Sequence, residues 1–190
     1  MKKAILTLIV SLFAVISFAQ SEHLTFKGVP IDGTLSQFVS SMKAKGFVVT
    51  AQQSGVAVLS GDFAGYKDCE IYVQTLQNKD LVSHIGVIFP EMSSWSTLEG
   101  NYSKLKNMLT QKYGEPVHCL EAFQRDDIDD DNSKFYELKM NRCYYQSMWE
   151  LKNGKIGLKL ISVDYKCNVM LVYTDKINTE EVEQAAMDDL

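Results

Sequence analysis

Histidine and cysteine, the side chains most often used as bases, nucleophiles and metal ligands, number three and four in this chain. His118 and Cys119 are neighbours, but successive residues on a strand point to opposite faces, so we do not expect them to act as base and nucleophile. The sequence has no Gly-x-Ser-x-Gly, His-Glu-x-x-His or Cys-x-x-Cys motif. Gly61 and Gly65 precede a strand pattern, whereas phosphate loops precede a helix. We therefore expect no enzymatic activity and no cofactor.

The most acidic stretch of the chain is residues 126–133, with the sequence DDIDDDNS. Asp127, Asp129 and Asp131 occupy positions 1, 3 and 5 of a calcium-loop pattern. Asn132 stands where that pattern needs glycine, and its last position lacks the glutamate that binds through both oxygens. Two interpretations remain: a weak calcium site, or a solvated hairpin tip whose charges discourage edge-to-edge aggregation.

Aromatic and sulfur-containing side chains are concentrated within residues 143–151. In a strand, Tyr145 and Trp149 share one face, and Tyr144 and Met148 share the other. The second face is more apolar than a face in contact with solvent needs to be. Since such side chains dominate the energetics of interfaces, we predict that all four form a partner-binding surface. Packing within the core and a hairpin is the alternative.

Two of the cysteines are placed symmetrically about the acidic stretch, because Cys119 and Cys143 each lie twelve residues from Asp131. A hairpin centred on Asp131 would set these two cysteines opposite each other, about 4.5–5.5 Å apart between α-carbons. We therefore predict a disulfide between them. Cys69 and Cys167 begin other strand patterns and are expected to be either separated or buried as free thiols.

The first segment of the chain, residues 1–19, has the parts of a secretory signal peptide. Two lysines precede an apolar run at residues 4–18, and Ser17 and Ala19 supply the small residues of a cleavage site. A membrane anchor is the alternative, but the run is short for a bilayer core of about 30 Å. We expect cleavage that leaves Gln20 as the new terminus, and export to the periplasm or the exterior.

Residues 20–190 suffice for one substantial core. The formal net charge of the whole chain is −5, and loss of two lysines with the signal makes it more negative. Nucleic acid and anionic lipid require basic patches, so neither is an expected partner. A second apolar run of spanning length is missing from the sequence, so we expect no membrane span after cleavage. The expected partner is a protein of the cell envelope.

Two segments have helical periodicity. One starts at Asp32-Gly33-Thr34 and ends at Gly46; the other ends at Gly114, and Ser96 with Glu99 is predicted to form its capping box. Apolar side chains recur at intervals of three and four residues in both segments (Leu35, Phe38, Val39, Met42; Trp95, Leu98, Tyr102, Leu105, Leu109, Tyr113). Such stripes predict helices that pack on a core.

Alternating apolar and polar residues predict half-buried antiparallel strands. The Asn153-Gly154 pair predicts a hairpin with a type I′ turn. Residues 176–190 form an acidic tail, with a short helix expected from Asn178. The predicted strands are residues 47–51, 56–63, 69–76, 82–89, 117–123, a piece within 135–151, 156–163 and 167–174.

Together these elements predict a single α+β domain over residues 20–175, in which two helices pack on one face of a mostly antiparallel sheet. The two halves are similar: residues 36–46 resemble residues 103–114, and each segment precedes a run of strands. We therefore predict a duplicated helix-then-strands unit with repeats at residues 24–89 and 94–175.

In element order, residues 24–175 resemble secreted bacterial inhibitors of the β-lactamase-inhibitor-protein type and small outer-membrane assembly subunits. The resemblance implies helices laid across an antiparallel sheet, twice in tandem in the inhibitors. This chain has one long helix per unit where the inhibitors have two, and it lacks the lipidation cysteine of the assembly subunits. The expected function is a non-enzymatic binding or inhibitor-like module. The alternatives are a structural or assembly factor of the outer envelope and a small hydrolase.

Overall fold

The computed structural model describes residues 23–180 and Met187; the expected signal peptide and most of the acidic tail lie outside this range. The fold is α+β, with one large antiparallel sheet and a two-stranded ribbon, β1 (Thr25–Phe26) and β2 (Val29–Pro30). A short helical segment at 176–180 follows the last strand. The other helices are α1 (Leu35–Ala44), α2 (Trp95–Tyr113) and α3 (Asp131–Lys139). The large sheet consists of β3 (Val48–Gln53), β4 (Val56–Phe63), β5 (Tyr66–Leu76), β6 (Lys79–Ile88), β7 (His118–Phe123), β8 (Cys143–Leu151), β9 (Gly154–Val163) and β10 (Lys166–Asp175).

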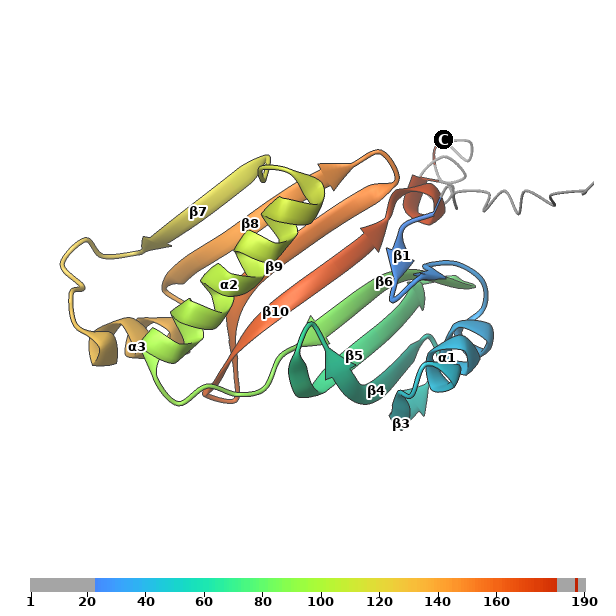
Figure 1. Cartoon of the computed structure of the whole chain (residues 1–190), viewed down its shortest axis with the longest axis horizontal. Helices are drawn as coiled ribbons and strands as arrows, with labels where there is room; N and C mark the ends of the chain where they lie inside the picture. The colour runs from blue at the N-terminus through green and yellow to red at the C-terminus, as the bar shows by residue number, and fades with distance from the viewer. Residues whose placement is uncertain (1–22, 181–186, 188–190) are drawn as a thin grey trace, which may run out of the picture.

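The eight strands are arranged in the order β3-β4-β5-β6-β10-β9-β8-β7, and every neighbouring pair is antiparallel (Figure 1). The first four strands lie side by side in chain order, and the last four do so in reverse. The two groups meet where β10 pairs with β6, with Leu171 opposite Val87. The last strand of the sequence is therefore central in the sheet.

Both predicted long helices are confirmed. The four apolar residues predicted for α1 are all buried, and a capping box between Thr34 and Gln37 begins the helix. In α2, the cap is Ser94 rather than the predicted Ser96. Glu99 is not available for a capping box because its carboxylate accepts hydrogen bonds from Trp95 Nε1 and the Tyr145 hydroxyl, both at 3.2 Å.

The acidic stretch is not the tip of a symmetric hairpin, because α3 follows it. Asp130 caps this helix by accepting a hydrogen bond from the backbone N–H of Ser133 at 3.0 Å. The strand predicted within residues 135–151 is β8, which begins at Cys143, and Phe135 is half-buried within α3. Arg142 then closes the C-terminal end of α3 by donating two hydrogen bonds to Glu137, at 2.7 and 2.8 Å.

The predicted disulfide between Cys119 and Cys143 is also wrong. In the β7–β8 ladder Cys119 lies opposite Ser147, and Cys143 lies opposite Phe123. All four cysteines of the chain fall within the described residues and are free. The helix makes the connection asymmetric, so the ladder is symmetric about Ser133 instead of Asp131.

The β8–β9 hairpin is present, but its turn differs from the predicted one. Leu151 pairs with Gly154, so the turn residues are Lys152 and Asn153. Neither turn residue has a backbone φ in the left-handed region, and Gly154 does not either. Gly154 serves close packing, since a Cβ there would collide with the Thr174 carbonyl. The sequential left-handed residues that a type I′ turn requires occur between β9 and β10, at residues 164–165 with φ of 50° and 63°.

A fully buried carboxylate ties the first described residues to the end of the sheet. Asp175 accepts hydrogen bonds from the Leu24 backbone N–H at 2.7 Å, from His23 Nδ1 at 3.1 Å and from the Asn178 backbone N–H at 3.0 Å. The Asn178 amide in turn donates to the carbonyl of Val82 at 2.8 Å. These bonds join three segments that are distant in the sequence.

Candidate functional site

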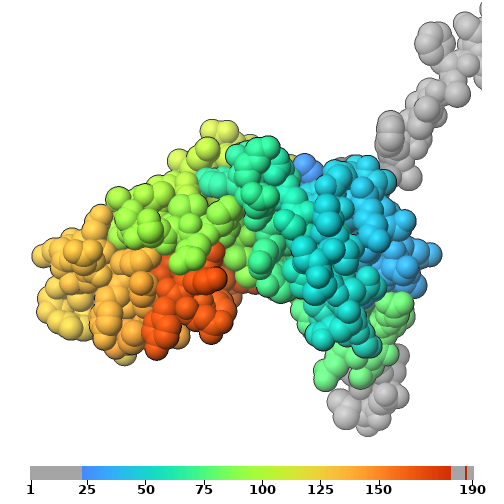
Figure 2. Space-filling model, turned by 90° about the horizontal axis from the view of Figure 1, so that it is seen from below, coloured from blue at the N-terminus to red at the C-terminus, as the bar shows by residue number. Residues whose placement is uncertain are grey.

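The two faces of the large sheet differ in exposure. One face carries strand residues that are buried in the hydrophobic core. The other, which we call the open face, carries side chains that are exposed or half-buried, such as Tyr144 and Met148 on β8. Figure 2 shows the molecule as an arch that is hollowed on the side away from α2. The hollow lies between the end that contains α3 (orange) and the end that contains β3 to β6 (cyan to green).

Residues of the open face form rows across the strands, because the register aligns them. One row crosses six adjacent strands from β5 to β7, and a second row lies beside it; the first row is the more apolar of the two. The first row is Tyr72, Gly86, Val172, Gly157, Met148 and His118. The second row is Glu70, Ile88, Met170, Lys159, Gln146 and Leu120.

Two glycines flank Val172 in the first row, and one of them leaves open space. A Cβ added at Gly157 would meet no atom within 4 Å, and one added at Gly86 would meet the terminal methyl of Met170 at 3.3 Å. A shallow cavity of about 410 Å³ lies over Gly157, with Val172, Met148 and other side chains around it. The missing side chain of Gly157 therefore creates a depression with an apolar floor on the open face, whereas the space over Gly86 is filled by Met170.

Charged groups lie beside this depression. Lys159 contributes to its wall. Lys155 and Glu150 occupy the next row, with Nζ 3.8 Å from the carboxylate. The depression is therefore bordered by polar groups that remain in contact with solvent, which is how protein interfaces are commonly organised.

The structure divides the four predicted partner-binding residues between the two faces. Tyr144 and Met148 lie on the open face, 43% and 36% exposed. Trp149 is 1% exposed and is a core residue, which the alternative of core packing anticipated. Tyr145 is half-buried on the same face as Trp149, and its ring packs edge-on against Trp95 with the centroids 5.1 Å apart. A partner on the open face would therefore contact only the first two residues.

Sequence reasoning did not single out Tyr72, Gly86, Gly157 or Val172 as site residues. The alternation within each strand shows which face these residues occupy. Their alignment in one row depends on the β6–β10 pairing and on the registers of the other ladders. No local pattern specifies that pairing.

A serine–histidine contact on β6 does not provide a catalytic pair. Ser83 Oγ lies 2.7 Å from His84 Nδ1, at a bulge where the register between β5 and β6 shifts. Ser83 is 0% exposed, so a substrate cannot reach its hydroxyl. Burial lowers the pKa of His84, which therefore stays neutral at pH 7.

The three carboxylates of the predicted weak calcium site have separate roles. Asp127 pairs with Arg125, whose Nη2 lies 2.7 Å away, and this pairing lowers the pKa of Asp127. Asp131 begins α3, and Asp129 is exposed in the preceding loop. Within the described part of the chain, no group of three or more histidine, cysteine or acidic side chains is arranged to hold a metal ion.

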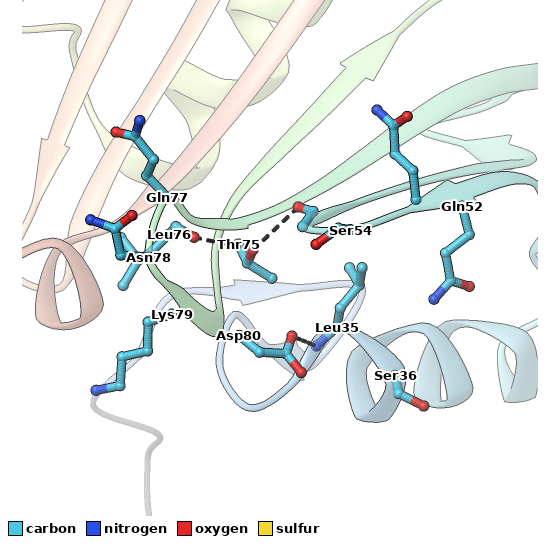
Figure 3. A pocket seen from close by; sticks show the side chains of 12 residues that line it. Leu35, Ser36, Gln52, Ser54, Thr75, Leu76, Gln77, Asn78, Lys79 and Asp80 are labelled. Atoms are coloured by element: carbon cyan, nitrogen blue, oxygen red, sulfur yellow. Dashed lines mark hydrogen bonds between the residues drawn. The ribbon is translucent and has the colours of Figure 1, made fainter.

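A larger and more polar cavity, of about 670 Å³, lies beside the start of α1 (Figure 3). Amide side chains such as Gln52, Gln77 and Asn78 line it. The cavity contains the carboxylate of Asp80, which lies on β6. This carboxylate accepts a hydrogen bond from the Leu35 backbone N–H at 2.9 Å and so helps to cap the start of α1. The acidic group of this cavity thus has a structural role.

Comparison of the chain with protein-family models, with curated proteins and with solved structures finds no match. Among residues 23–180 and Met187, no helix has the length and apolar character needed to cross a membrane.

Proposed function

We propose that this protein is a non-enzymatic binding module whose open sheet face grips a partner protein, while α1 and α2 together cover the other face. The observation that carries the proposal is the depression over Gly157, which lies between the apolar side chains of Val172 and Met148. Removing side chains from the centre of an exposed apolar face lowers the stability of the strands, since glycine is unfavourable in them. Such a cost is reasonable where another molecule approaches the backbone closely.

The shape of the open face favours a protein over a small ligand. Small molecules usually bind in enclosed cavities that bury most of their surface. Here the depression is shallow, and the row that contains it continues past Val172 to Tyr72. A protein partner can cover the whole row, whereas a small molecule would cover only the part around Val172.

The floor and wall of the depression specify what the partner should present. An apolar side chain, such as leucine or phenylalanine, fits over Gly157 and against Val172 and Met148. A carboxylate beside it can pair with the Lys159 ammonium. We therefore propose a partner segment in which a large apolar residue lies next to an acidic one.

The proposal includes an origin by duplication. A helix followed by four strands occurs twice, as α1 with β3 to β6 and as α2 with β7 to β10, and the strand order is symmetric about the β6–β10 pair. In this interpretation α3 is an insertion in the second unit. The tandem arrangement supports the resemblance to secreted inhibitors, and with it a partner among proteins of the cell envelope.

Gly157→Leu tests the open face directly. Its side chain has room to enter the depression, so we expect the variant to fold and to occupy the position of the partner's apolar residue. Gly100→Leu, on α2, is the matched control, because a Cβ there also meets no atom within 4 Å. Wild type and both variants are immobilised and exposed to the envelope fraction of the native host, and each retained protein is then purified and titrated against all three.

We expect at least one retained protein to bind wild type and Gly100→Leu equally well, and Gly157→Leu at least about tenfold more weakly, as for a central interface residue. Equal affinity for all three would refute the assignment to this face. The assignment would also be refuted if immobilised wild type retained no more protein than immobilised Gly157→Leu.

Export is a separate part of the proposal and has its own test. The intact mass of the protein isolated from its native host should correspond to a chain that begins at Gln20, with or without cyclisation to pyroglutamate. A species that still contains Lys2 and the apolar run would contradict cleavage and support a membrane anchor.

A further inference from the structure

A second cavity adjoins the depression on the open face. Its volume is about 430 Å³, and the exposed or half-buried side chains of Tyr144, Ile161 and Met170 contribute to its wall. The two cavities share Gln146 and Lys159, so they lie end to end along β8 and β9. We call them together the trough. It has apolar side chains at both ends and a lysine in the middle.

The lysine in the middle of the trough has no counterion. Lys159 is exposed and forms no hydrogen bond or ion pair with any residue that the structure describes. Lys155, on the same strand and face, differs because its ammonium lies 3.8 Å from the carboxylate of Glu150. An unpaired ammonium group on an interface attracts a carboxylate and disfavours a cation. A ligand that fills the trough should therefore carry an acidic group between two apolar ones.

The strands beneath the trough determine which backbone conformation of a partner fits. β8 pairs with β7 and β9, and β9 pairs with β8 and β10, so both strands are paired on both sides. An extended segment laid over them gains no main-chain hydrogen bonds, which are what holds a peptide extended when it is added at a sheet edge. A helix forms its backbone hydrogen bonds internally and can contact the face through side chains alone. The interior position of the trough therefore favours a helix.

The spacing along β9 agrees with the spacing along one side of a helix. Gly157 and Ile161 are four residues apart on this strand, which corresponds to about 13 Å, and Lys159 lies midway between them. In an α-helix, residues i and i+7 lie on one side about 10.5 Å apart, with residue i+4 between them. The difference of about 2–3 Å is within the reach of leucine, glutamate and lysine side chains.

On the basis of the proposed function, we propose that the partner protein contacts the trough with an amphipathic helix that lies along β8 and β9. The helix carries large apolar residues at i and i+7 and an acidic residue at i+4. One apolar side chain enters the depression over Gly157, and the other enters the second cavity beside Tyr144. The acidic side chain pairs with Lys159. Lys159 therefore selects the partner by charge, and the two cavities select it by spacing.

The probe is a labelled, alanine-based synthetic peptide of about eighteen residues, long enough to form a helix in water, with leucine at i and i+7 and glutamate at i+4. Its affinity is measured by fluorescence anisotropy. Lys159→Glu should weaken binding at least about tenfold, because it replaces an attractive pair by a repulsive one. Lys43→Glu, which makes the same charge change on α1, should bind as wild type does. A peptide with lysine at i+4 should reverse the preference and bind Lys159→Glu more tightly than wild type.

Two further comparisons test the cavities and the helix. Tyr144→Ala should weaken binding of the glutamate peptide, whereas Tyr165→Ala, which removes another exposed tyrosine from the turn before β10, should not. A peptide of the same composition with glutamate at i+2, on the opposite side of the helix, should bind wild type at least about tenfold more weakly.

The inference is overturned if wild type does not bind the glutamate peptide, if Lys159→Glu binds it as well as Lys43→Glu does, or if Gly157→Leu binds it as well as wild type does. The proposed function has its own readout in the titration of retained envelope proteins. A retained protein that Gly157→Leu binds weakly would support that function even if the peptide failed.

Discussion

Asp175→Ala is expected to lower the free energy of unfolding by about 3–5 kcal/mol, because it removes a fully buried acceptor of three hydrogen bonds. The variant leaves the backbone N–H groups of Leu24 and Asn178 without their partner in the protein interior. It also disconnects the N-terminal segment from the end of β10. For a domain of this size, the melting temperature should fall by roughly 6–20 °C.

The measurement is urea unfolding followed by fluorescence and circular dichroism. Asp129→Ala is the matched control, because it removes the same charge from an exposed position, and it should change stability by no more than about 0.5 kcal/mol. Asp175→Asn should be intermediate, since an amide retains one acceptor oxygen. Equal unfolding midpoints for Asp175→Ala and Asp129→Ala would contradict the structural role of this carboxylate.

Trp149→Ala should have an effect of similar size, about 3–5 kcal/mol, for a different reason. The substitution leaves a cavity in the core, where Trp149 is 1% exposed. It also removes the hydrogen bond that the indole Nε1 donates to the Gly114 carbonyl at 2.8 Å, which helps to fix the end of α2. This prediction distinguishes a core residue from the interface anchor that the sequence suggested.

Met148→Ala is the comparison for Trp149→Ala, one position earlier on the same strand but on the open face. Because its side chain is 36% exposed, truncation should cost less than about 1 kcal/mol in chemical unfolding. In the binding assay described for Gly157→Leu, however, Met148→Ala should lower the affinity for the retained partner protein. A large stability loss for Met148→Ala, or a small one for Trp149→Ala, would mean that the two faces are assigned incorrectly.

The sequence predicts much of the fold because most helices and strands have one apolar side that is buried, and this side gives a periodic pattern. The stripe from Trp95 to Leu109 specifies α2, and alternation specifies strands such as β5 and β6. The helix α3 was missed because most of its side chains are polar, and the pattern that begins it is a local cap by Asp130. The disulfide prediction failed for the same reason, since it assumed that the segment before Cys143 was a symmetric turn.

The candidate sites were harder to predict because they depend on contacts between distant segments. The alternation of side chains along the strand placed Tyr144 and Met148 on one face and Trp149 on the other. It did not show which of the two faces was buried. The hydrogen bond from Lys106 Nζ to Cys119 Sγ was not predicted, because Lys106 reaches the sulfur only when α2 packs beside β7. Such contacts arise from tertiary packing and leave no local pattern in the sequence.

The central position of β10 has a consequence for synthesis and assembly of the chain. Strands β3 to β6 can pair as they emerge, and β7 to β9 can do the same, but no strand pairing joins the two groups until β10, which begins at Lys166, is available. Until then, β6 and β9 each present an unpaired edge, the kind of surface on which chains associate wrongly. Completion of the sheet is therefore a late, long-range step. A chain that ends before β10 would have two separate groups of strands with no hydrogen-bonded strand between them.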